Sequence, residues 1–96
     1  MTELLDSFAS RGVVCGPYVR ADQPKLATRE WGHCAWDGTT FDVYLHSGNA
    51  EQTRQMWEGL KGMASGYVLL GGNYSIIVDE SAKATVLAAK LGMAIL

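Results

Sequence analysis

Two cysteines and two histidines are the residues of this chain best suited to chemistry, since thiolates and imidazoles bind zinc and act as nucleophile and base. They are Cys15, His33, Cys34 and His46. Their spacing argues against a metal site, because His33 and Cys34 are consecutive on a predicted strand and point to opposite faces. The chain also has no Cys-x-x-Cys or His-x-x-x-His pair. We therefore expect no metal, no cofactor and no catalytic residue, and expect that the chain is not an enzyme.

The two cysteines are expected to be free thiols that behave as small buried hydrophobic side chains in a reducing compartment. Cys34 falls on the predicted core face of its strand, whereas Cys15 precedes the Gly16-Pro17 pair. If a relative of this chain were exported, the pair could form a disulfide. Only a structure shows whether the geometry allows that bond.

One acid–base pair follows from the strand register. Asp37-Gly38 is a strong signal for a two-residue hairpin turn, which requires positive φ at both central positions. A turn at these two residues places His33 opposite Asp42. A carboxylate beside an imidazole could orient a catalytic histidine, but such a pair is more often a surface ion pair of small energetic effect.

The same register gathers aromatic and polar side chains on the non-core face of this hairpin. They are Trp31, His33, Asp42, Tyr44 and His46. Clustered aromatic side chains on one sheet face are typical of recognition surfaces, because they offer contact area at low entropic cost. We take these five residues as the candidate interaction face. The alternative is that the N-terminal helix, or the connection over residues 20–29, covers this face.

From about residue 30 the chain repeats one pattern of strand, tight turn, strand and amphipathic helix. The first copy has strands over 31–36 and 39–45 and a helix whose buried stripe includes Trp57 and Met63; the second has strands over 67–70 and 73–78 and a final helix ending at Gly92. A short helix over 3–10 and a strand over 13–19 come first. Gly16-Pro17 gives that strand a bulge, a bend or an edge position, since proline cannot donate to a ladder.

The predicted order α-β-ββα-ββα indicates an α+β two-layer sandwich, with helices on one face of an antiparallel sheet of four or five strands. A ferredoxin-like arrangement is the alternative, but it needs a helix between the first two strands, where the sequence reads as loop. The second hairpin is apolar on both faces, which indicates a central position or an interface.

Length and charge limit the function classes. Ninety-six residues predict one domain over 1–96, and a net charge of -2 with eight scattered lysines and arginines argues against a nucleic-acid binder. No apolar stretch approaches the roughly 20 residues that span a bilayer, so no membrane contact is expected. The first ten residues carry two acids, and they have neither the basic segment nor the long apolar core of a secretory signal. We therefore expect a cytoplasmic location.

A family resemblance covers roughly the last two-thirds of the chain. Gly72–Ser81 reads Gly-Asn-Tyr-Ser-Ile-Ile-Val-Asp-Glu-Ser, and an alanine-rich helix ending Lys-Leu-Gly follows. With Cys34 and the strand over 41–47, this stretch resembles small actinobacterial, often lipoprotein-like, proteins of unknown function, which place a Gly-x-Asn-aromatic strand before a final helix. The resemblance implies no catalytic residues. This chain departs from it in having no recognisable signal sequence or lipobox.

These observations predict a small non-enzymatic module that binds a protein partner or itself through the candidate interaction face and the apolar second hairpin, in a regulatory, inhibitory or assembly role. One alternative is a small-ligand binder or enzyme that uses His33, Asp42 and His46. Another is an accessory protein of a phage or mobile element.

Overall fold

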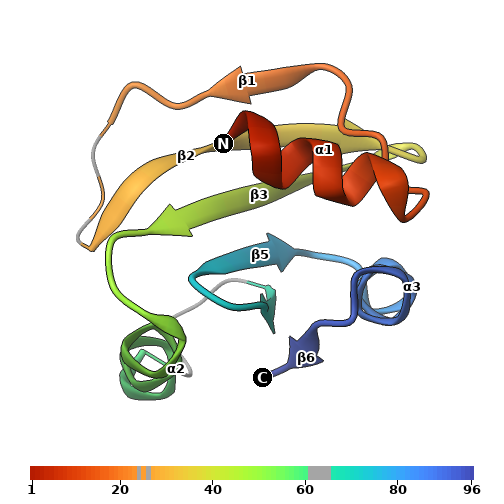
Figure 1. The fold of residues 1–96 in the computed structure, drawn as a ribbon. Helices are drawn as coiled ribbons and strands as arrows, with labels where there is room; N and C mark the ends of the chain where they lie inside the picture. Colours follow the sequence, from red (N-terminus) through yellow and green to blue (C-terminus); the bar gives the residue numbers. More distant parts are fainter. Residues whose placement is uncertain (24, 26, 61–65) are drawn as a thin grey trace.

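The computed structural model describes residues 1–23, 25, 27–60 and 66–96, which form three helices around one antiparallel sheet (Figure 1). The elements are α1 (Thr2–Ser10), β1 (Tyr18–Arg20), β2 (Thr28–Trp36), β3 (Thr39–His46), α2 (Ala50–Gly59), β4 (Tyr67–Leu70), β5 (Tyr74–Val78), α3 (Ser81–Leu91) and β6 (Ala94–Ile95). The strand order is β1-β2-β3-β5-β4-β6, and every pair is antiparallel. The predicted α+β class with an antiparallel sheet is confirmed.

The hairpin of β2 and β3 has the predicted register. Asp37 and Gly38 adopt φ of 47° and 75°, as a tight turn of this kind requires. Trp36 therefore pairs with Thr39, and His33 pairs with Asp42. The ladder extends regularly from the turn to a bulge between Thr28 and Glu30.

The first face of the sheet carries the larger core. Alternation along β3 places Phe41 and Val43 on this face, where they pack with Phe8 of α1 and Leu87 of α3. The full buried set is Phe8, Val13, Cys34, Phe41, Val43, Leu69, Ile76, Val78, Ala84, Leu87, Leu91 and Met93. α1 and α3 thus cover the first face, on which the sequence prediction had placed all the helices.

The second face carries a smaller core under α2. Trp57 of α2 packs with Tyr44, Val68 and Leu70, which point away from the first face. We expected all helices on one face, so the side taken by α2 differs from the prediction. The physical reason lies in the second hairpin, whose second face is also apolar and requires a cover. Met63, predicted to continue the buried stripe of α2, lies outside the described residues.

In the part of the chain that the structure describes, the sheet has six strands where four or five were expected. The additional strand is β6, in which Ala94 and Ile95 pair with Leu70 and Leu69. The first strand is shorter than the predicted 13–19 and begins after Pro17. The described residues between β1 and β2 form no helix, so the ferredoxin-like alternative does not apply.

Cys15 and Cys34 form a disulfide, with an S–S distance of 1.99 Å and Cα atoms 5.0 Å apart. The expectation of two free thiols was therefore wrong. Cys34 points to the first face from β2, and the segment between α1 and β1 brings Cys15 over it. The bond joins this segment to β2, the strand next to the edge strand β1, across 19 positions of sequence.

Within the described residues, none of the helices has the length and apolar content needed to cross a membrane.

Candidate functional site

All five residues of the candidate interaction face lie on the second face of the sheet. Trp31 and His33 come from β2, and Asp42, Tyr44 and His46 come from β3. Trp31 pairs with Tyr44 and His33 pairs with Asp42, as the turn at residues 37 and 38 predicted. The prediction that these residues share a face is confirmed.

Two of the five are not exposed, which corrects the expectation of an open aromatic surface. Tyr44 is 4% exposed and His46 is 2% exposed. Trp57 of α2 meets both rings edge-on, with centroid distances of 6.1 Å to Tyr44 and 6.4 Å to His46. These aromatic side chains hold α2 on the sheet and are not available to a partner.

The connection between β1 and β2 covers Trp31. The indole Nε1 donates to the Gln23 carbonyl at 2.6 Å, and Lys25 Nζ lies 4.6 Å from the centroid of the Trp31 ring. Trp31 also stacks on Tyr44, with centroids 5.3 Å apart and an interplanar angle of 15°. Of the two covers that the sequence left open, Gln23 and Lys25 of the connection over residues 20–29 lie against this face, whereas the N-terminal helix packs on the first face.

A chain of hydrogen bonds runs through the buried half of the second face. The Trp57 indole donates to Ser75 Oγ at 3.0 Å, and Ser75 Oγ lies 2.7 Å from His46 Nε2. His46 Nδ1 lies 3.3 Å from the Ala27 carbonyl, which can only accept. The network therefore assigns the proton to Nδ1 and leaves Nε2 to accept from the serine hydroxyl. Burial lowers the pKa of His46, opposed by the bond to Ala27, so the ring is held neutral.

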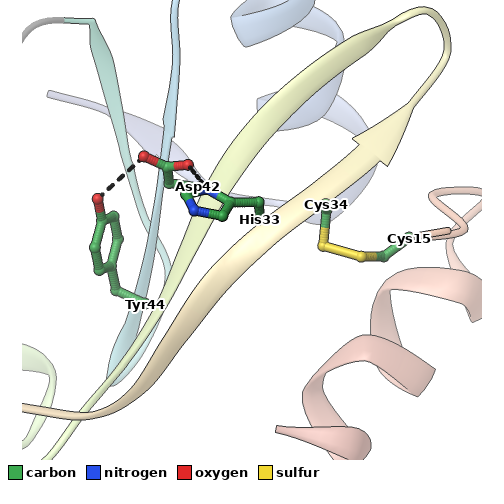
Figure 2. A network of polar contacts seen from close by, with 5 residues as sticks. All are labelled: Cys15, His33, Cys34, Asp42 and Tyr44. Atoms are coloured by element: carbon green, nitrogen blue, oxygen red, sulfur yellow. Dashed lines mark hydrogen bonds and ion pairs between the residues drawn. A yellow bond between two sulfur atoms is a disulfide. The ribbon is translucent and has the colours of Figure 1, made fainter. Parts of the chain in front are cut away.

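His33 and Asp42 remain open to solvent. His33 Nδ1 lies 2.6 Å from Asp42 Oδ1, and their side chains are 43% and 33% exposed. Figure 2 shows this pair on the opposite side of β2 from the disulfide, with the Tyr44 hydroxyl directed at Asp42 Oδ2 over 3.3 Å. Burial, and then the Asp42 charge, raise the pKa of Tyr44, so its hydroxyl stays a donor.

This arrangement orients the His33 ring with Nε2 available for proton transfer. It holds no thiol nucleophile, because both cysteines are in the disulfide. Among the described residues, no group of three or more acidic, histidine or cysteine side chains could hold a metal ion. The pair therefore supplies a base or a hydrogen-bonding group at the surface.

The sequence interpretation missed the outer edge of β1. The Ala21 amide donates to the Trp31 carbonyl at 2.9 Å, which places Val19 and the other odd-numbered residues on the hydrogen-bonded side facing β2. Tyr18 and Arg20 consequently turn their N–H and C=O groups away from the sheet. In the described part of the chain these backbone groups have no hydrogen-bond partner. Figure 1 shows β1 with no element beyond it.

Exposed apolar side chains accompany this edge. Val19 is 56% exposed and Val14, which precedes β1, is 65% exposed. Val19, His33, Asp42 and Ile77 are Cα partners in turn across β1, β2, β3 and β5. The solvent-exposed His33 and Asp42 on the second face are therefore next in line to Val19, at the outer edge of the sheet.

The Tyr18 side chain of β1 is held in place on the first face. The Tyr18 hydroxyl donates to Glu30 Oε2 at 2.8 Å, and its ring lies over Gly32, where an added Cβ would be 2.7 Å from Tyr18 Cε1. Burial and the bond to Glu30 raise the pKa of Tyr18, so the hydroxyl stays protonated and continues to donate. Arg20 follows on the same face, with Gly32 as its Cα partner in β2. The edge strand is thus preorganised before any partner arrives.

Comparison with known proteins gives no relative for this chain: no family model, no curated protein and no solved structure matches it.

Proposed function

We propose that this chain is a non-enzymatic protein-binding domain that takes an extended segment of a protein partner at the outer edge of β1. The observation that carries the proposal is the pair of unpartnered backbone positions, Tyr18 and Arg20, on either side of the exposed Val19. An extended segment that adds to a sheet edge gains affinity from main-chain hydrogen bonds and specificity from alternate side chains.

The surroundings of the edge support this mode of binding. Val19 offers apolar area on the second face, and His33 beside it offers a hydrogen-bonding ring nitrogen. On the first face Arg20 and Glu30 supply charges of both signs. A segment with an apolar residue opposite Val19, and polar residues on either side of it, fits this edge. The proposal replaces the interaction face predicted from sequence, since Tyr44 and His46 are buried.

The test compares two substitutions at one position. Arg20→Pro removes an outward N–H that bonds to nothing in the described chain, and proline is tolerated on edge strands. Arg20→Ala removes the same side chain and keeps the N–H. Tagged wild type and Arg20→Ala should retain a stoichiometric partner from the native host, whereas Arg20→Pro should lose it. Equal retention by all three chains would contradict binding at this edge.

A second candidate function rests on the 2.6 Å contact between His33 Nδ1 and Asp42 Oδ1. This contact would suit a small-ligand binder or an enzyme that uses the free ring nitrogen of His33 as a base. His33→Gln distinguishes the two candidates. The substitution should leave partner retention unchanged if the β1 edge binds, and should abolish ligand binding or turnover if the pair is the site.

The location that goes with this function is also a proposal. The sequence predicted the cytoplasm, but disulfides persist in oxidising compartments and are rare in the cytosol. The bond between Cys15 and Cys34 therefore favours action outside the cytoplasm. An exported form would agree with the resemblance to lipoprotein-like actinobacterial proteins, which stays a prediction. Thiol labelling of the chain in its native host, before any reductant is added, tests the location: two labelled cysteines would contradict it.

A further inference from the structure

We propose that the extended segment bound at the β1 edge is β1 of a second copy of this chain, so that two sheets join into one across a two-fold axis. This inference rests on the proposed function and names its partner.

The edge is self-complementary about Val19. In an antiparallel pair of β1 strands with Val19 on the axis, Tyr18 of each copy lies opposite Arg20 of the other. Both residues present their N–H and C=O groups outward, so each such pair exchanges both backbone hydrogen bonds. A shift by one residue would place inward-facing groups opposite outward-facing ones and lose these bonds.

The second face gains apolar contact from this register. The Val19 side chains of the two copies become a directly opposed, non-hydrogen-bonded neighbour pair on the second face, where side chains approach most closely. Each Val19 is 56% exposed in the single copy, so the contact removes apolar area from water that the isolated chain leaves open.

The first face gains a second cross-strand pair from the same register. Arg20 of one copy lies opposite Tyr18 of the other, whose ring is held over Gly32 by its hydrogen bond to Glu30 at 2.8 Å. The Arg20 side chain therefore meets an aromatic side chain that the second copy already holds in place, and the two-fold repeats the contact. Directly opposed side chains of this kind stabilise the pairing of neighbouring strands.

The test is sedimentation velocity of the purified, disulfide-bonded chain over a concentration series. Wild type should form a dimer, and Arg20→Ala should weaken it by less than about fivefold, as expected for the loss of one exposed cross-strand side-chain contact on each side of the axis. Arg20→Pro should weaken it by at least about tenfold, because a backbone hydrogen bond is lost on each side of the axis. Val19→Lys should also give a monomer, because it places two like charges next to each other on the two-fold axis. Since Val19 is 56% exposed in the single copy, this substitution should leave the fold intact.

The other outcomes are equally decisive. A wild type that stays monomeric, together with loss of a different captured protein by Arg20→Pro, would overturn pairing between copies and leave the proposed function standing. A dimer that survives both Arg20→Pro and Val19→Lys would place self-association elsewhere and overturn the inference. A monomeric wild type that captures nothing in any form would overturn both.

Discussion

His46 and Ser75 are joined by a hydrogen bond of 2.7 Å between the imidazole Nε2 and the hydroxyl Oγ, in the buried layer between α2 and the sheet. The bond has a direction, because His46 Nδ1 faces the Ala27 carbonyl and carries the ring proton, which leaves Nε2 to accept from the Ser75 hydroxyl. A second proton on the ring would make Nε2 a donor, remove the acceptor for the Ser75 proton and place a charge in this buried layer. A neutral His46 therefore stabilises the layer through which α2 is attached to the second face.

The first prediction is a loss of stability on mild acidification. Burial lowers the pKa of His46 in the folded state, so this group stabilises the fold fully above its unfolded pKa of about 6.5. That contribution is lost as the pH falls from about 6.5 toward the lower folded-state pKa. The free energy of unfolding, measured by urea denaturation, should fall between about pH 7.5 and about pH 5.5.

The matched control is His46→Gln, which accepts from Ser75 through its amide oxygen and does not titrate. The variant should lose less stability than wild type over the same pH interval, since carboxylates that titrate in both chains cancel in the comparison. Parallel pH profiles for the two chains would show that His46 is not the group responsible.

The second prediction concerns the disulfide. The disulfide closes a loop across 19 positions of sequence and so lowers the conformational entropy of the unfolded chain. We therefore expect that breaking it lowers the free energy of unfolding by about 3 kcal/mol. Cys15→Ala, which leaves the buried Cys34 in place, should show this loss in urea denaturation. Wild type with reductant should match the variant, and a wild type indifferent to reductant would contradict the role given to the bond.

The third prediction tests how closely β1 packs against β2 at Gly32. Gly32 leaves room for the Tyr18 ring, and an added Cβ would press on the Val19 carbonyl as well as on that ring. Gly32→Ala should therefore push β1 away from β2, destabilise the fold by about 2 kcal/mol and weaken any assembly at the edge. The control is Gly59→Ala, where the added Cβ meets nothing within 4 Å. Equal stability of the two variants would mean that β1 is held more loosely than the structure indicates.

Features of the fold that depend on neighbouring residues were predicted correctly from the sequence, and features that depend on tertiary packing were not. Asp37-Gly38 is local, and a two-residue turn determines the register of both strands, so the pairing of His33 with Asp42 was correct. The disulfide was missed because the path of the segment that carries Cys15 is set by tertiary packing. Neither position nor spacing indicated that it would cross Cys34.

The candidate site was predicted in part for a similar reason. Alternation along β3 put Tyr44 and His46 on the correct face, but it carried no information on what covers that face. The apolar second face of the β4–β5 hairpin did signal a cover, and α2 supplies it. Gly16-Pro17 likewise indicated an edge position, yet the free backbone groups of Tyr18 and Arg20 became visible only with the strand order.

Amide hydrogen exchange at β1, followed residue by residue in the dilute chain and in its assembled form, tests directly whether this edge is open to a partner. We expect fast exchange at Tyr18 and Arg20 and slow exchange at Val19 when the chain is alone, because of these three residues only Val19 directs its backbone groups at β2. On assembly, with a second copy or with a captured partner, Tyr18 and Arg20 should become slow while Val19 changes little. Protection at Tyr18 and Arg20 in the dilute chain, or assembly that leaves both fast, would contradict an open binding edge.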